Sequence, residues 1–141
     1  MTANTITKTV MGFHIDVFGH VNNARYLEFY EEARWLLYAE PINIALKQGF
    51  AFVIVNVNVN FRAALTLFDD INISAELARV NSRSAVIRQA ITSVSGDKRY
   101  SDAEVTFVLL DVNTQTPAVI ADNPICTQCI EEMQNFSNKG A

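Results

Sequence analysis

The sequence predicts an α+β domain in which one long helix is followed by a run of antiparallel strands. The chain has 141 residues and half of them are apolar, which is the size of one domain with a complete core, so residues 1–141 are assigned to a single domain. Apolar side chains recur at helical spacing between Asn23 and Tyr38, whereas alternation and short turns dominate from Phe52 to Val112. One long helix, followed by strands long enough to curl around it, defines the α+β class.

The first part of the chain is expected to contain a strand, a loop and the long helix. Residues 5–13 form the strand and residues 16–22 the loop. The helix begins at Asn23 and carries an apolar stripe made of Tyr26, Tyr30, Ala33 and Leu37. Pro41 ends or interrupts this helix, and residues 42–48 add a short helical turn before Gly49.

The middle of the chain is expected to form the sheet. Phe52–Phe61 alternates strictly, which predicts one buried face carrying Val53, Val55, Val57 and Val59 and one largely polar face. Further strands are expected over residues 71–80, 85–94 and 100–112. Only short turns separate them, at 81–82 and 95–97, so they should be antiparallel neighbours. Residues 124–136 predict a C-terminal helix and 137–141 a frayed end.

A sheet of this kind has exposed edge strands, which a protein usually covers. Pairing with a second copy of the chain would cover one. A homodimer is therefore the smallest assembly that we expect, and a homotetramer is the alternative.

The segment from Asp16 to Asn23, with the sequence DVFGHVNN, carries the chemistry. It places an acid, a flexible glycine, the imidazole of His20 and two amides that favour helix starts within eight residues. The N–H groups and the positive dipole end of the following helix would face the same space as Asp16 and His20. This arrangement can stabilise negative charge that develops on a carbonyl oxygen.

With the aromatic and acidic helix that follows it, this motif resembles the 4-hydroxybenzoyl-CoA thioesterase family of hot-dog-fold enzymes. The chain is most similar to the bacterial long-chain acyl-CoA thioesterases in that family. The likeness extends from about Thr7 through residues 56–62 to about Val112. It implies a curved antiparallel sheet wrapped around a central helix. It also implies hydrolysis of a fatty acyl-CoA, of medium to long chain, to the fatty acid and coenzyme A without a cofactor.

The resemblance also implies roles for individual residues. Asp16 matches the aspartate that acts as nucleophile or general base, and both roles stay open. The oxyanion donor is a backbone N–H in the first helical turn, which falls near Asn23. His20 has three candidate roles: polarising the carbonyl, orienting Asp16 or stacking against the helix.

Three glutamates on the helix are a second candidate source of the catalytic carboxylate, because another branch of hot-dog thioesterases places its acid there. They are Glu28, Glu31 and Glu32. Arg25 and Arg34 lie at helical pairing distance, so an exposed face of ion pairs explains the same residues without catalysis.

Substrate-binding residues are expected on the helix and on the sheet. Tyr26 and Tyr30 are candidates to line an acyl tunnel, although aromatic stripes also form cores. Arg62, Arg83 and Arg88 are candidates to bind the phosphates of coenzyme A. A sheet edge protected by charge is the alternative for the basic stretch 79–99.

Composition excludes several other classes. A net charge of −4 and a pI near 5.1 argue against nucleic acid or an anionic membrane as the main partner. No charged leader precedes an apolar run and no window reaches the length of a membrane span, so no membrane insertion and a cytoplasmic location are expected. Cys126 and Cys129 have no second ligand pair nearby, which favours packing over a metal or redox site.

Two rival functions stay open from the sequence. A hot-dog hydratase or dehydratase would also use an acid or a histidine beside a helix, but to move a proton at carbon. A non-catalytic module would bind acyl-CoA or an acyl carrier without cleaving it. The acyl length and the choice between coenzyme A and an acyl-carrier protein are not fixed by the residues.

Overall fold

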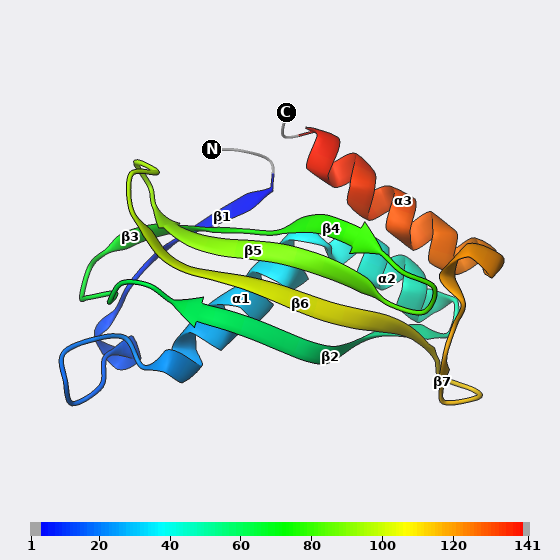
Figure 1. Cartoon of the computed structure of the whole chain (residues 1–141), viewed down its shortest axis with the longest axis horizontal. Coiled ribbons are helices and arrows are strands. Elements are labelled where there is room, and N and C mark those ends of the chain that lie inside the picture. The colour runs from blue at the N-terminus through cyan, green and yellow to red at the C-terminus, as the bar shows by residue number, and fades with distance from the viewer. Residues whose placement is uncertain (1–3, 140–141) are drawn as a thin grey trace.

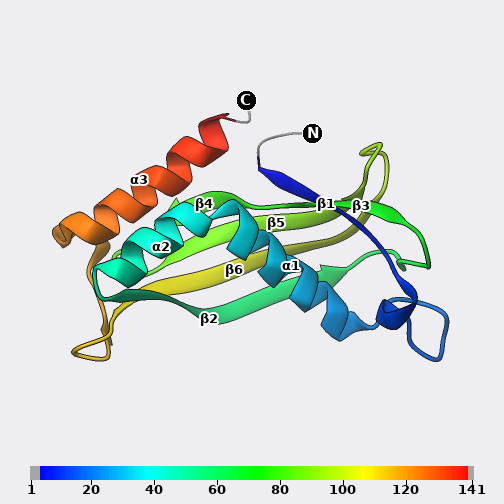
Figure 2. The same cartoon turned by 180° about the vertical axis from the view of Figure 1, so that it is seen from behind.

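A computed structural model describes residues 4–139, with side chains through residue 136. One antiparallel sheet curves around helix α1, which lies behind the sheet in Figure 1 and in front of it in Figure 2. This confirms the α+β class and the curved sheet around a central helix. The elements are β1 (Thr5–Thr9), α1 (Asn23–Leu37), α2 (Ala39–Lys47), β2 (Phe50–Phe61), β3 (Asp70–Ser74), β4 (Glu76–Val80), β5 (Ala85–Ser93), β6 (Arg99–Asp111), β7 (Thr116–Pro117) and α3 (Pro124–Lys139).

The strand order is β1-β3-β5-β6-β2, with β4 also pairing β5 and β7 pairing β6. The turns expected at 81–82 and 95–97 join β4 to β5 and β5 to β6, and those strands are antiparallel neighbours. β2 pairs only with β6 among the described residues, so its other side is an edge of the sheet.

Helix α1 begins and ends where local signals place its bounds. The Asn22 side chain accepts a hydrogen bond from the Ala24 N–H at 2.9 Å, and Tyr38 closes the helix by donating its N–H to the Arg34 carbonyl at 3.0 Å. α2 follows at once, and Pro41 sits in its first turn, where a missing N–H costs no intrahelical bond. α2 is therefore longer than the short turn expected over 42–48.

Several predicted elements differ from the structure at their bounds. The first strand stops at Thr9, and Gly12–His14 form a 3-10 turn in which the Met11 N–H donates to the His14 imidazole at 2.9 Å. The single strand expected over 71–80 breaks at the fully buried Ala75. α3 extends to Lys139, three residues beyond the helix expected over 124–136, and residues 140 and 141 lie outside the described residues.

A β-bulge in β2 changes which side chains face inward. Ile54 lies opposite the buried Phe107 and Asn56 opposite Thr106, so Val55 has no partner and the alternation reverses there. Val53 pairs with Val108 on the outer face, whereas Ile54 shares the inner face. The single buried face predicted from the four valines is therefore wrong, and Val55 is 56% exposed.

The core has two parts that meet along the sheet. One packs α1 against β1 and β3, and the other packs α2 and α3 against the other end of the sheet. Cys126 and Cys129 are free thiols fully buried in the second part, and burial raises the pKa of Cys129 to about 11. Within residues 4–139, no helix is long and apolar enough to cross a membrane, and no group of three or more His, Cys, Asp or Glu side chains could hold a metal ion.

Candidate active site

The loop before α1 is closed by its own backbone. The Asp16 N–H donates to the His20 carbonyl at 2.9 Å, and the Gly19 N–H donates to the Asp16 carbonyl at 3.1 Å. Gly19 has φ +80°, a left-handed conformation that glycine adopts without strain. Asp16 Oδ1 accepts the Phe18 N–H at 2.9 Å, while Oδ2 has no hydrogen-bond partner within residues 4–139. One carboxylate oxygen holds the turn and the other is available for chemistry.

The first turn of α1 leaves one backbone donor open. The Asn22 side chain satisfies the Ala24 N–H, and the Asn22 carbonyl accepts the Arg25 N–H at 2.9 Å. The Asn23 N–H has no acceptor in the part of the chain that the structure describes. It stands at the positive end of a 15-residue helix, where an anionic oxygen is stabilised.

Five of the residues singled out in the sequence line one hollow of about 700 Å³. They are Asp16, His20, Asn23, Tyr26 and Arg62. The exposed ring of Phe18 and the ring of Phe61 lie on its wall. The hollow therefore combines a carboxylate, an imidazole, an open N–H and a cation.

Tyr26 contributes its ring to the hollow, because its hydroxyl is engaged by the backbone. The hydroxyl donates to the Ala63 carbonyl at 3.3 Å and accepts the Leu65 N–H at 3.2 Å. The ring meets that of Phe61 edge to face at 5.1 Å. Burial raises the pKa of Tyr26, so the phenol stays neutral. Tyr26 thus fixes the floor of the hollow against the segment after β2.

Arg62 is held by an acid on the neighbouring strand. Its Nε and Nη2 both donate to the Asp102 carboxylate, the latter at 3.2 Å, and the Nη1 of Arg99 lies 3.8 Å from the same group. The bond from Arg62 lowers the pKa of Asp102. Two cations share one carboxylate here, which leaves a net positive charge beside the hollow. Arg99 belongs to the basic stretch 79–99 noted in the sequence, whereas Arg62 directly follows β2.

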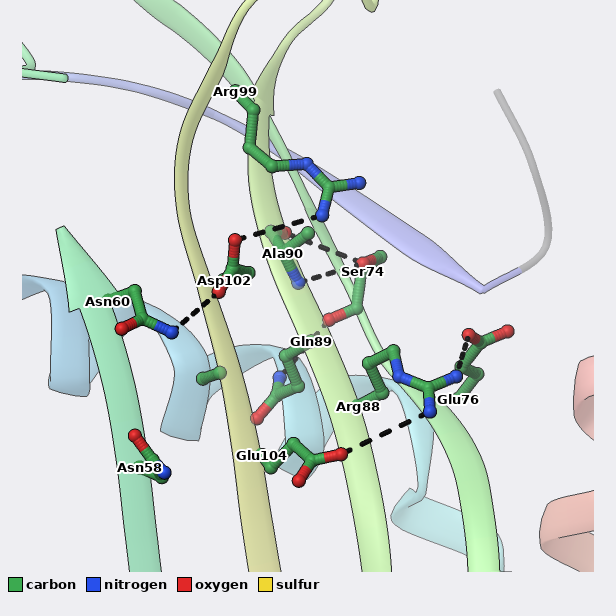
Figure 3. Close-up of a pocket in the computed structure, with 11 residues that line it drawn as sticks. Asn58, Asn60, Ser74, Glu76, Arg88, Gln89, Ala90, Arg99, Asp102 and Glu104 are labelled. Carbon is green, nitrogen blue, oxygen red and sulfur yellow. Dashed lines mark hydrogen bonds and ion pairs between the residues drawn. The ribbon is translucent and has the colours of Figure 1, made fainter. Parts of the chain in front are cut away.

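Tyr30, Arg83 and Arg88 lie away from this hollow. The Tyr30 hydroxyl donates to Ser101 Oγ at 2.6 Å, and Tyr30 lines a different hollow further along α1. The β4–β5 turn that carries Arg83 lies at the other end of the sheet from the loop before α1 (Figure 1). Arg88 projects from the outer face of the sheet, where Figure 3 shows it between Glu76 and Glu104, with its Nη atoms at 3.5 and 4.0 Å from their carboxylates.

Two of the three helix glutamates are engaged in ion pairs. Glu28 lies 2.9 Å from Arg25 and Glu32 lies 2.9 Å from Lys8. Arg34 does not make the glutamate pair that its helical spacing suggested. Its side chain turns inward to the sheet and donates to Gln89 Oε1 at 3.0 Å.

His14 anchors the loop and was missed by sequence reasoning. It is buried, its Nδ1 accepts the Met11 N–H, and its carbonyl accepts the Asn22 N–H at 3.2 Å. Its ring packs edge to face on Phe29 at 4.9 Å. Burial, then the charges of Lys8 and Arg25, lower the pKa of His14. No pattern in the sequence separates this imidazole from an exposed one.

Comparison with known proteins connects this geometry to a family. The model of the Thioesterase-like superfamily matches residues 11–127. The chain is 43% identical over 108 residues to the long-chain acyl-CoA thioesterase FadM of Escherichia coli strain K12, covering 75% of this chain and 82% of FadM.

Two solved structures share the architecture. The probable thioesterase YbaW of Escherichia coli aligns with a TM-score of 0.86 at 36% identity, covering 92% of this chain and 98% of that one. Slr0204, a 1,4-dihydroxy-2-naphthoyl-CoA thioesterase from Synechocystis, aligns with a TM-score of 0.77 at 15% identity, covering 92% and 96%, which shows a shared fold. The chain therefore belongs to the thioesterase-like superfamily, with its hot-dog fold, and is a thioester hydrolase.

Proposed function

We propose that this protein hydrolyses medium- to long-chain fatty acyl-CoA to the free fatty acid and coenzyme A. The observation that carries the proposal is that one hollow is lined both by Asp16, which has an unengaged carboxylate oxygen, and by Asn23, whose N–H is open. The relative FadM, named for long-chain acyl-CoA, supports the substrate class.

In the proposed reaction the thioester oxygen accepts a hydrogen bond from the Asn23 N–H, whose donor strength rises with the helix dipole. Asp16 Oδ2 either removes a proton from the attacking water or attacks the carbonyl carbon itself to give an anhydride that water then opens. In both routes the C–S bond breaks and coenzyme A leaves as a thiolate. A thiol is acidic enough to leave without strong proton donation. His20 is proposed to orient Asp16 or to polarise the carbonyl.

The acyl chain is proposed to follow the seam between α1 and β2. Beyond Tyr26 and Phe61, two further hollows continue along this seam, of about 270 Å³ and 250 Å³. Leu27, Tyr30, Ile54 and Val57 line the nearer one. An apolar chain is bound there by burial alone, so affinity should rise with length.

The nucleotide end is proposed to lie toward the positive charge that Arg62 and Arg99 share beside the hollow. Arg83 and Arg88 remain proposed phosphate ligands. Because the turn with Arg83 lies at the far end of the sheet, its part in the site requires a second copy of the chain.

We also propose a homodimer as the smallest assembly. β2 offers a free edge of 12 residues, with exposed apolar side chains such as Val55 and Val57. Pairing at the β2 edge would cover the seam between α1 and β2 with a second copy of the chain. Light scattering after gel filtration should give a mass of two or four chains, and a monomer at micromolar concentration would contradict this assembly.

Release of free thiol from palmitoyl-CoA is the decisive experiment. We expect steady release that depends on enzyme concentration. Two outcomes would favour the rivals. Loss of the enoyl absorbance of hexadecenoyl-CoA without thiol release would indicate a hydratase, and tight binding of palmitoyl-CoA without either reaction would indicate a binding module.

A further inference from the structure

Arg34 is a half-buried cation on the inner side of α1, and it lines both of the hollows beyond the candidate active site. Within the described residues, no carboxylate lies within 4.0 Å of its guanidinium. Five other arginines each have a carboxylate within that distance: Arg25, Arg62, Arg79, Arg88 and Arg99. The one hydrogen bond of Arg34 goes to a neutral amide, Gln89 Oε1, at 3.0 Å. The other N–H donors of the fork have no acceptor there.

The position of this guanidinium is fixed by a fully buried side chain. Gln89 is 0% exposed, and its Nε2 donates to the Tyr30 carbonyl at 3.1 Å and to the Ser74 carbonyl at 3.2 Å. Because both amide hydrogens are used, only the amide oxygen is left to face Arg34. The buried Gln89 amide therefore fixes the orientation of the Arg34 guanidinium.

The charge of Arg34 is poorly compensated. Burial lowers the pKa of its guanidinium, while the charge of Glu31 raises it. Glu31 is exposed and lies outside ion-pair distance, so water screens much of its effect. A desolvated cation without a partner is costly, and an anion that reaches it removes part of that cost.

The backbone of Arg34 also lies at a defined distance along α1 from the proposed oxyanion donor at Asn23. It is eleven residues beyond Asn23 on one helix, which corresponds to about 16 Å along the axis. The nearer hollow lies between them and is lined mainly by apolar groups, including Tyr30, Ile54 and Val57, with Glu28 and Glu31 as its acidic residues. A long acyl chain with its carbonyl at Asn23 would bring its far end to Arg34.

We propose that Arg34 binds a carboxylate at the far end of the acyl chain, so that the enzyme accepts long ω-carboxy acyl-CoA thioesters as well as simple fatty ones. This inference rests on the proposed acyl-CoA hydrolysis and names a substrate class for it. Short dicarboxylic acyl groups end before the guanidinium and gain nothing from it.

The test compares palmitoyl-CoA with the mono-CoA thioester of hexadecanedioic acid, which differs only at the terminal carbon. In Arg34→Met, kcat/KM for the dicarboxylic substrate should fall roughly ten- to 100-fold more than that for palmitoyl-CoA, the worth of one charge-assisted contact. Arg34→Lys keeps the positive charge but lacks the planar guanidinium, so it should recover part of the kcat/KM that Arg34→Met loses on the dicarboxylic substrate. Adipoyl-CoA should show no extra dependence on Arg34.

Arg25→Met is the matched control, because Arg25 lies on the same helix but outside both hollows and pairs with Glu28. It should leave the ratio between the two long substrates unchanged. Calorimetric binding of hexadecanedioic acid and palmitic acid to the unmodified protein requires neither turnover nor a variant. The diacid should bind about tenfold tighter or more.

Several results would overturn the inference. Equal binding of the two acids by the unmodified protein would do so, as would an equal loss of both activities in Arg34→Met. Dissociation of the oligomer in Arg34→Met at an unchanged substrate ratio would assign Arg34 to a contact between copies instead. Failure to cleave either thioester would refute the proposed hydrolysis, while the binding comparison would still decide on Arg34.

Discussion

Replacing Asp16 by asparagine separates the two tasks of this side chain. Oδ1 of Asp16 holds the turn by accepting the Phe18 N–H at 2.9 Å, and an amide oxygen can accept the same bond. The backbone bonds of the turn, from Asp16 to His20 and from Gly19 to Asp16, do not involve the side chain. The free energy of unfolding should therefore change by less than about 0.5 kcal/mol.

Catalysis should respond very differently to the same substitution. An amide cannot accept the proton of water or attack a thioester at neutral pH. Loss of a positioned acid–base group lowers kcat by about 10²–10⁴, or roughly 3–5 kcal/mol in the barrier, and loss of a nucleophile lowers it further. Thiol release from palmitoyl-CoA measures kcat, and urea unfolding of the same samples measures stability. Asp16→Ala is the control, because it should add a stability loss of about 1 kcal/mol to the same loss of kcat.

A near-normal kcat in Asp16→Asn would refute this assignment. The helix carboxylates would then be the next candidates, and Glu31 first among them, because Glu28 and Glu32 are held by Arg25 and Lys8. Rapid quench followed by mass spectrometry distinguishes the two roles of Asp16. An acyl adduct on this residue indicates a nucleophile, and its absence during turnover indicates a general base.

Four further outcomes are expected. Across an acyl series, kcat/KM should rise by up to about 0.8 kcal/mol per added CH₂ until the seam is full, and equal rates for acetyl, octanoyl and palmitoyl thioesters would exclude an apolar tunnel. Arg83→Ala with Arg88→Ala should raise KM for acyl-CoA roughly five- to 150-fold at nearly constant kcat and spare the acyl-pantetheine thioester, whereas equal losses on both substrates would make these arginines structural. Tyr30→Phe should lower the free energy of unfolding by about 1–3 kcal/mol, because it strands the buried hydroxyl of Ser101, and adding Ser101→Ala should restore much of it in urea titrations. Burial lowers the pKa of His14 below 6.5, so the unfolded chain binds a proton at a higher pH than the folded chain does. The free energy of unfolding should therefore fall as the pH drops below about 6.5, and His14→Gln should lose this part of its pH dependence.

The sequence was most informative where local signals are strong. The Asn22 cap, the positive φ of Gly19 and the apolar stripe of α1 are each set by neighbouring residues, so the loop and helix start were predicted correctly. The gathering of Asp16, His20 and Asn23 in one hollow follows from their closeness in the chain. That Arg62 lines the same hollow depends on the tertiary path of β2, which the sequence alone does not show.

The predictions failed where long-range pairing decides the outcome. The bulge at Val55 depends on how β2 meets β6, and no alternation within β2 reveals it. Arg34 and Glu31 have ideal helical spacing for an ion pair, but Gln89 on β5 offers a buried acceptor and draws the guanidinium inward. Spacing along a helix states which pairs are within reach, whereas the packing of the opposite layer determines which pairs form.

Helix α1 carries both the proposed oxyanion donor and the residue proposed to recognise the chain end. Its first turn supplies the open N–H of Asn23, its next turns line the seam beside β2, and its fourth turn carries Arg34, which lines both hollows of that seam. Because an α-helix is rigid over this length, the backbones of Asn23 and Arg34 are held about 16 Å apart along the helix axis. A substitution that shifts the helix along its axis would therefore move both ends together. For an ω-carboxy substrate, the chain length should then have to match the span from Asn23 to Arg34, whereas for a simple fatty substrate each added carbon should raise kcat/KM until the seam is full.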